Sequence, residues 1–352
     1  MSRQPARRSL PRNARHSGQG RSRYPGRRPV RRRRRDTPGQ AMTRFLVSFL
    51  LALAVFLPLG VWVGKSLQGS GAILARPVPS PTAAPTPEPV DMTGLNSPHA
   101  ILLRRGGPVL GEVGADDPIY PASLTKMMTV LLAAETLTDL DAQVTMAEDL
   151  YPPLWEANAS MAGFQPGETV TVRDLLYGAL LPSGAECCSA LARQVCDTEQ
   201  DFVARMNARA AELGMDSTHF CNVTGLQDPQ HQSTVADLAR LLDAALNNDT
   251  FRTVFTTRQY FVPPTNLHPD GITLTSSMFD GLTDTQPAGV ELLGGKTGFT
   301  DEAGLCLASL ARCGDSEYIL VTAGAPGDNH SETLHLEDAV TVYTRLAASI
   351  AG

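Results

Sequence analysis

The sequence predicts an α+β domain that follows a single N-terminal transmembrane helix. Segments with strand character lie at both ends of residues 96–352, and the long stretch between them has apolar residues at three- and four-residue spacing, which is typical of helices. Neither an internal repeat nor a second linker divides this region. We therefore expect one domain whose sheet is completed by strands from both ends of the region.

The first 44 residues are strongly basic. Residues 1–41 contain 14 Arg and a single acidic residue, Asp36, whereas the remaining 311 residues hold 16 basic and 35 acidic side chains. An Arg-rich tail of this kind can bind nucleic acid. Its place directly before an apolar stretch favours a topology signal instead, because basic residues mark the cytoplasmic side of a transmembrane helix. We expect a disordered cytoplasmic tail at residues 1–44 with no nucleic-acid partner, and Met42 is an alternative start of the chain.

The apolar stretch, FLVSFLLALAVFLPLGVWV, spans residues 45–63. As a helix it would extend about 28 Å, close to the roughly 30 Å hydrocarbon core of a bilayer. A cleaved signal peptide is the alternative, but its apolar region is usually shorter, about 7–15 residues, and the small-residue cleavage site at Ser70-Gly71-Ala72 is weak. We expect an uncleaved signal-anchor helix. The Pro-rich residues 64–95 are expected to form a semi-extended linker.

The predicted elements of the domain at residues 96–352 follow a simple order. A hairpin comes first, at residues 100–105 and 108–113, and an apolar helix follows at residues 124–137. The helical middle consists of four amphipathic segments, at residues 171–181, 185–195, 201–214 and 234–247. Three strands and one helix close the chain, at residues 289–298, 303–312, 317–325 and 332–351.

All six cysteines lie in this domain, between residues 187 and 313. An exported domain permits disulfides without requiring them. Cys306 and Cys313 fall in one predicted strand, which would separate them by about 23 Å, and a bridge needs about 7 Å or less between Cα atoms. A bridge between Cys196 and Cys221 is possible, and buried free thiols are an equal alternative.

The chain uses Lys only three times, at Lys65, Lys126 and Lys296, against 27 Arg. Lys126 follows Ser123 by three residues at the start of the apolar helix, which places both side chains on one helix face. A serine hydroxyl needs a base to become a nucleophile, and a lysine can be that base when burial and charge lower its pKa by about 3 units. Arg cannot deprotonate. The spacing arises by chance about once in fifteen, so other motifs must support the prediction.

Two further motifs give that support. Ser183-Gly184-Ala185 lies between two predicted helices, and Lys296-Thr297-Gly298 ends a predicted strand. An S-x-x-K pair with an S-x-N-like element and K-T-G is the motif set of penicillin-binding proteins and β-lactamases. His and Cys residues show no metal-ligand spacing, so we expect neither a metal nor a cofactor.

Over residues 98–325 the chain resembles the serine D-alanyl-D-alanine carboxypeptidases, the low-molecular-weight penicillin-binding proteins. The segments that carry the resemblance are YPASLTKMMT, MAGFQPGETVTVRDLLYGALLPSG, MNARAAELGM, FCNVTGL, HQSTVADLARL and GGKTGFTDEAGLCL. The resemblance implies an antiparallel sheet covered by helices, plus an all-helical subdomain that forms one wall of the cleft. It also implies an enzyme that trims terminal D-Ala from peptidoglycan stem peptides outside the bacterial cell membrane and is inhibited by β-lactams.

The resemblance assigns three residues to the chemistry. Ser123 would be the acylated nucleophile and Lys126 its base. Ser183 would pass a proton between the lysines and the leaving amine. Ala185 stands where the family usually has Asn, and position 185 is expected to open a helix that faces the cleft. An impaired protein that only binds stem peptides is therefore an alternative.

Four further residues are expected to bind the substrate. Lys296 and Thr297 would hold its terminal carboxylate, and Gly298 would allow close approach of the strand. The backbone N–H groups of Phe299 and the nucleophile would form the oxyanion hole. Family members often carry an Arg that helps to grip the carboxylate, but residues 326–337 contain none. A β-lactamase is less favoured, because no E-x-x-L-N-like segment occurs between the helices.

Overall fold

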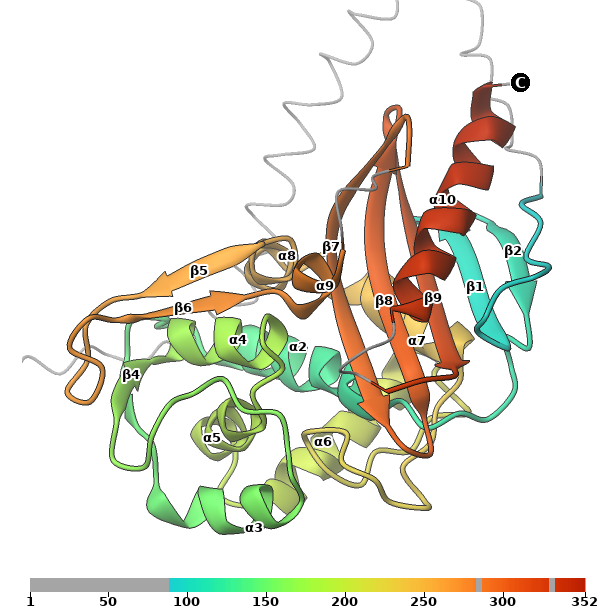
Figure 1. The fold of residues 1–352 in the computed structure, drawn as a ribbon. Helices are drawn as coiled ribbons and strands as arrows, with labels where there is room; N and C mark the ends of the chain where they lie inside the picture. The colour runs from blue at the N-terminus through green and yellow to red at the C-terminus, as the bar shows by residue number, and fades with distance from the viewer. Residues whose placement is uncertain (1–88, 283–286, 329–332, 352) are drawn as a thin grey trace, which may run out of the picture. The chain divides into compact units, whose positions relative to one another are not determined.

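Five antiparallel strands form the central sheet, in the order β2-β1-β9-β8-β7. The computed structural model describes residues 89–282, 287–328 and 333–351. The five strands are β1 (His99–Arg104), β2 (Val109–Val113), β7 (Val290–Thr300), β8 (Gly304–Cys313) and β9 (Ser316–Ala325). β1 pairs with β9, so strands from both ends of the domain lie side by side (Figure 1), which confirms the predicted α+β sheet.

Helices cover both faces of this sheet. α10 (Leu334–Ala351) and α9 (Ser277–Gly281) lie on one face, and α7 (Val235–Ala245) lies on the other (Figure 1). Because successive side chains of a strand point to opposite faces, Leu102 packs in the apolar cluster on the α10 side, and Ile101 packs in the cluster shared with the remaining helices. The sheet is therefore buried on two sides, while β7 forms one edge.

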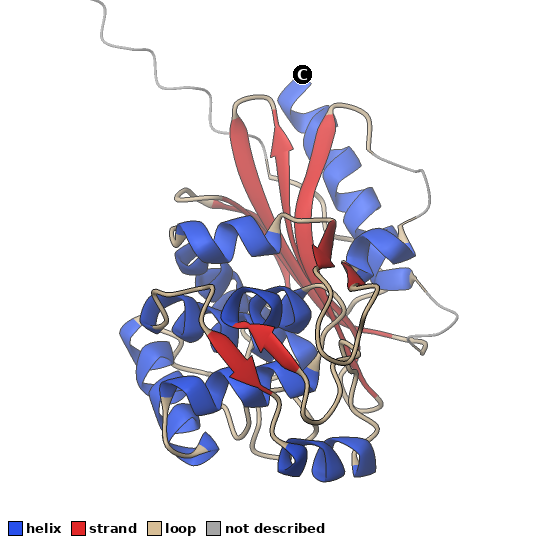
Figure 2. Ribbon diagram, turned by 90° about the vertical axis from the view of Figure 1, so that its left-hand side faces the viewer, coloured by secondary structure: helices blue, strands red, loops and turns tan. Residues whose placement is uncertain are grey.

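The other helices form a second group beside the sheet (Figure 2). They are α2 (Lys126–Thr136), α3 (Tyr151–Glu156), α4 (Val172–Leu180), α5 (Ala185–Val195), α6 (Glu199–Glu212) and α8 (Asp249–Phe255). Side chains fix several of their starts; at α4, Thr171 and Asp174 form a reciprocal capping box. The apolar α2 lies at the centre of the group, with Met127 and Met128 fully buried.

Two small hairpins complete this helical group. β3 (Gln143–Thr145) pairs with β4 (Thr169–Thr171), and β5 (Gln259–Val262) pairs with β6 (Ile272–Thr275). The prediction of an all-helical subdomain was wrong in this respect. Strands of three or four residues are too short to produce a clear alternating pattern in the sequence.

The N-terminal predictions fall mostly outside the described residues. The basic tail and the apolar stretch at 45–63 lie wholly outside them, and no helix within the described ranges is long and apolar enough to span a bilayer. The last residues of the predicted linker pack on the domain. Val90 is 5% exposed and its N–H donates to Leu110 O at 2.7 Å, while Arg345 donates to the backbone O of Asp91 at 2.7 Å. All six cysteines are free, including Cys196 and Cys221.

Candidate active site

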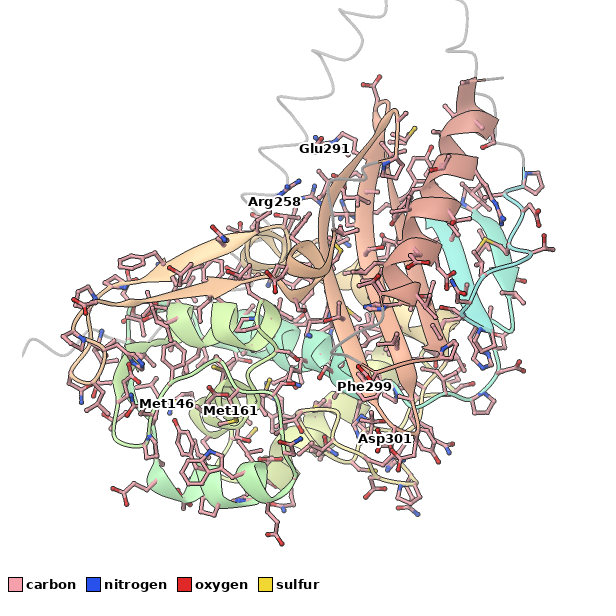
Figure 3. The ribbon with its side chains drawn as sticks, in the orientation of Figure 1. Met146, Met161, Arg258, Glu291, Phe299 and Asp301 are labelled. Atoms are coloured by element: carbon pink, nitrogen blue, oxygen red, sulfur yellow. The ribbon has the colours of Figure 1, made fainter. Side chains whose placement is uncertain are left out.

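Ser123 lies in a short 3-10 helix, Ala122–Thr125, that runs directly into α2. The site is therefore at the N-terminal end of the buried central helix, beside the end of β7 that carries Phe299 (Figure 3). A Cβ placed on Gly298 would lie 3.1 Å from Ser123 N. A glycine at this position lets the strand approach Ser123 closely, and the predicted approach of the strand to the substrate stays a prediction.

Lys126 is buried directly beneath Ser123. Its side chain is 2% exposed, and Nζ lies 2.7 Å from Ser123 Oγ and donates to Thr224 O at 2.7 Å. Burial lowers the pKa of Lys126. A neutral amine has two N–H groups and one lone pair. Since Thr224 O accepts one N–H, the lone pair can take the proton of Ser123, which is the geometry that a general base requires.

The loop at residues 221–226 holds the Thr224 carbonyl in place. Asn222 Oδ1 accepts the N–H groups of Thr224 at 3.1 Å and Gly225 at 2.7 Å, and Thr129 of α2 donates to Val223 O at 2.7 Å. Gly225 has a φ of 84°, and a Cβ there would lie 1.8 Å from Ala122 O. The sequence motif FCNVTGL indicated this loop only through the family resemblance and gave its residues no role.

A buried histidine ties the same loop to the short helix that carries Ser123. His231 Nδ1 accepts the backbone N–H of Cys221 at 3.0 Å, so the proton of the neutral ring must be on Nε2. Nε2 therefore donates to Thr125 Oγ1, 2.7 Å away. Burial lowers the pKa of His231 to about 4, which keeps the ring neutral at pH 7. His231 was expected to have no metal role, and its structural role could not be read from the sequence.

Lys296 comes from β7 but does not line the cleft. Its side chain is fully buried, and Nζ donates to the carbonyl O of its neighbour Thr297 at 2.7 Å. Burial, together with the positive charge of Lys126, lowers the pKa of Lys296 well below its ordinary value. The Thr297 hydroxyl does line the cleft, and its Oγ1 lies 2.5 Å from Ser277 Oγ. Of the two residues predicted to hold a carboxylate, Thr297 lines the cleft and Lys296 does not.

Two residues of the site have strained backbones. Ala122, directly before Ser123, has a φ of 44°, and Ser183 has a φ of 69°. A positive φ at a residue other than glycine costs about 1–3 kcal/mol, and residues with such strain are concentrated at functional sites. Ser183 lines the same cleft as Ser123, so the structure brings the two predicted serines together.

Ala185 does not face the cleft, contrary to the prediction. It is the first residue of α5, only 1% exposed, and its N–H donates to Ser160 O at 2.8 Å. The next residue, Glu186, is fully buried, and its Oε1 accepts the N–H groups of Ala162 at 2.7 Å and Gly163 at 3.0 Å. The start of α5 therefore packs against the segment around Ser160 rather than opening toward solvent.

The cleft has a volume of about 280 Å³. Its lining residues are Ser123, Ser160, Pro182, Ser183, Ser277, Gly281, Thr297, Gly298, Phe299, Leu305, Thr333, His335 and Leu336. Ser123, Ser183 and the edge of β7 thus meet in one cavity, with Lys126 buried beneath it. This combination suits acyl transfer from an extended peptide.

A family model described as D-alanyl-D-alanine carboxypeptidase matches residues 86–327. The chain belongs to the D-alanyl-D-alanine carboxypeptidase family. Among relatives, it is 31% identical over 246 residues to D-alanyl-D-alanine carboxypeptidase DacF of Bacillus subtilis, covering 68% of this chain and 60% of the relative. It is also 31% identical over 268 residues to DacC of Escherichia coli, covering 72% of this chain and 64% of the relative.

The solved structures of the family have the same fold. The crystal structure of the Streptomyces K15 DD-transpeptidase superposes with a TM-score of 0.66 at 28% identity, over 74% of this chain and 100% of that one. The chain spans less than two thirds of the length of the two curated relatives, DacF and DacC. The shared fold accounts for the antiparallel sheet and the helical group beside it.

Proposed function

We propose that the chain is a serine-type D-alanyl-D-alanine carboxypeptidase that removes the terminal D-Ala from peptidoglycan stem peptides through an acyl-enzyme on Ser123. The observation that carries this proposal is the 2.7 Å contact between Lys126 Nζ and Ser123 Oγ, made by a buried amine. Membership of the family, whose curated members are named for this activity, supports it.

In the first half-reaction, Lys126 takes the proton of Ser123 while Oγ attacks the carbonyl carbon of the penultimate D-Ala. The negative charge of the tetrahedral intermediate lies on the former carbonyl oxygen. The backbone N–H groups of Ser123 and Phe299 are the proposed donors to it, and one such donor contributes about 3–4 kcal/mol in well-studied proteases. The C–N bond then breaks, and Ser183 relays to the leaving amine of D-Ala the proton that Lys126 took from Ser123, which leaves Lys126 neutral again.

In the second half-reaction, water attacks the ester carbonyl and Lys126 accepts the proton of that water. The ester bond breaks, the shortened peptide leaves with a new carboxylate, and Ser123 Oγ takes back the proton from Lys126. Thr297 would contact the terminal carboxylate of the substrate directly. Lys296 would position Thr297 without touching the substrate, because its Nζ donates to the backbone carbonyl of Thr297 at 2.7 Å. Gly298 keeps that strand close enough to Ser123 for both contacts to occur at once.

The alternative of an impaired stem-peptide-binding protein is not favoured. It depends on a missing amide at position 185, but Ala185 is buried and is not among the residues that line the cleft. A side chain at that position is not placed to touch the substrate.

The proposal includes a membrane anchor at residues 45–63, with a cytoplasmic N-terminus and the domain outside the membrane. The sequence supports it through the Arg-rich residues 1–41, the uncharged 19-residue stretch and the Pro-rich linker. Protease added to intact protoplasts should digest the domain and spare the tail. A domain protected until the membrane is disrupted would contradict this topology.

Mass spectrometry with benzylpenicillin tests the activity. The intact protein should gain the mass of one penicillin, and Ser123→Ala should not, while its melting temperature stays close to that of the wild type. The wild-type protein should also release D-Ala from a pentapeptide, and Ser123→Ala should not. An adduct that persists on Ser123→Ala would identify another nucleophile, and rapid loss of the adduct with hydrolysed penicillin as the product would indicate a β-lactamase.

A further inference from the structure

Ser183 has a strained backbone at the junction of α4 and α5. Its φ of 69° is unfavourable for a residue with a side chain, so neighbouring contacts must hold it there. The two residues that follow are both anchored. Gly184 N donates to Gly178 O of α4 at 2.8 Å. Ala185 N donates to Ser160 O, also at 2.8 Å, which links the start of α5 to a different segment of the chain.

That segment is residues 160–164, which we call the wall segment because Ser160 lines the cleft. Glu186, in the first turn of α5, fastens the wall segment to this helix. Its Oε1 accepts the N–H groups of Ala162 at 2.7 Å and Gly163 at 3.0 Å, and its side chain is fully buried. One carboxyl group therefore fixes the backbone of the wall segment at two successive residues.

The wall segment packs tightly against both sides of Ser183. A Cβ placed on Gly184 would lie 2.6 Å from Ala162 Cβ and 2.9 Å from Ala162 N. A Cβ placed on Gly178 would lie 3.1 Å from the ring of Phe164, which is buried. Because such close packing transmits displacements, a wall segment that moved away from α5 would release the contacts that hold Ser183.

This clamp does not require the negative charge of Glu186. Its second oxygen, Oε2, is buried and has no hydrogen-bond partner among the residues that the structure describes. Burial raises the pKa of the carboxyl group. A protonated carboxyl group, or a neutral amide in its place, still offers one oxygen to the two backbone N–H groups. The clamp therefore depends on the acceptor atom and its position.

We propose that Glu186 is a positioning residue for proton transfer to the leaving amine: it clamps the wall segment to the start of α5 and thereby holds Ser183 in its strained conformation. This inference rests on the proposed function, in which Ser183 relays a proton from Lys126 to that amine. Glu186 is fully buried and is not among the residues that line the cleft, so it acts through the backbone and not on the substrate. Its loss should impair protonation of the leaving group more than the attack by Ser123.

Two substrates with the same acyl group and different leaving groups test this role. One is an N-acylated L-Lys-D-Ala-D-Ala peptide, whose leaving amine must be protonated. The other is the matching thiolester, with sulfur in place of the nitrogen of the last residue. It releases a thiolate that needs no proton to leave, because thiols have pKa values near 8.5, and the proton on Lys126 then passes to water. Glu186→Leu should lower kcat/KM by roughly 10- to 100-fold for the peptide and by less than about threefold for the thiolester.

The ratio of the two kcat/KM values is independent of how much of the variant folds, because both substrates meet the same active molecules. Glu186→Gln keeps the acceptor oxygen and should stay within about threefold of wild type on both substrates. Glu199→Leu is the matched control, because Glu199 accepts a hydrogen bond from Ser189 of α5 at 3.3 Å and should leave both rates unchanged.

A second variant carries the test if Glu186→Leu does not fold. Gly184 has a φ of −62°, which suits alanine, so Gly184→Ala adds only a Cβ that pushes Ala162 away. It should show the same selective loss of activity on the peptide.

Equal losses on the peptide and the thiolester, or no loss on either, would overturn the clamp, and so would a Glu186→Gln protein as impaired as Glu186→Leu. The proposed function fails separately. A wild-type protein that turns over neither substrate would contradict the acyl-enzyme reaction itself, whereas an active wild type with equal losses in Glu186→Leu would keep the reaction and exclude the positioning role.

Discussion

Substitution of Gly225 by Ala tests how the loop at residues 221–226 positions Ser123. The φ of 84° is unfavourable for a side chain by about 1–2 kcal/mol. The new Cβ would also lie 1.8 Å from Ala122 O and 3.0 Å from Ser123 N, so the backbone must shift, at a cost of about 1–3 kcal/mol. The free energy of unfolding should fall by about 2–5 kcal/mol, which lowers Tm by roughly 4–20 °C for a domain of this size.

The same shift moves Ser123 relative to Lys126 and Thr224 O, so penicillin acylation should slow by about tenfold or more. Gly214→Ala is the matched control, because Gly214 has a φ of 70° with nothing within 4 Å of a new Cβ. It should lose only about 1–2 kcal/mol and acylate at the wild-type rate. The reasoning is refuted if both variants lose the same stability, or if Gly225→Ala acylates normally in stopped-flow measurements with a fluorescent penicillin.

Three further predictions concern single side chains. Lys126→Arg keeps the charge but cannot accept a proton, so acylation should fall by about 100-fold or more, and a rate within threefold of wild type would exclude Lys126 as the base. Ala185→Asn enlarges a side chain that is 1% exposed and should lower stability by about 1–3 kcal/mol without faster D-Ala release; a faster variant of equal stability would contradict the buried position. His231 has its pKa lowered to about 4, so as the pH falls below about 6.5 the unfolded chain binds a proton that the folded chain does not. Stability should therefore fall by about 2–3 kcal/mol between pH 6.5 and pH 4, with His335 adding to the slope, and urea titrations of His231→Gln should show a flatter dependence than wild type.

The sheet and the long helices could be predicted because their patterns are local. The hairpin of β1 and β2, the three C-terminal strands and the amphipathic helices each bury one face, which imposes a period on the sequence. Strand-like segments at both ends of the domain predicted a shared sheet, but the pairing of β1 with β9 itself was not predicted. The hairpin of β5 and β6 gave no such signal, because its strands are short and only Val262 and Leu274 in them are buried.

The site was predictable only where chemistry restricts residue type. A base one helix turn from a serine can be Lys but not Arg, because Arg cannot deprotonate. In a chain with so few Lys, this requirement pointed to Ser123 and Lys126. The carbonyl of Thr224 and the ring of His231 act through the folded loop, so nothing in their spacing indicates a role. The prediction that Ala185 faces the cleft was wrong. The sequence indicates where a helix begins, but not which other segment packs against its first residues.

The two buried lysines also bear on how the protein can be improved in the laboratory. Lys126 is 2% exposed and Lys296 is fully buried, and burial lowers the pKa of both. Below their ordinary pKa of about 10.4, the unfolded chain binds protons that the folded chain resists, so both amines weaken the fold across the neutral range. A neutral side chain of similar length at either position removes this destabilisation, but it also removes an amine that the proposed reaction uses. Heat challenge alone would therefore enrich a library in inactive variants, and a screen for thermostable enzymes from this chain must sort surviving clones by penicillin labelling.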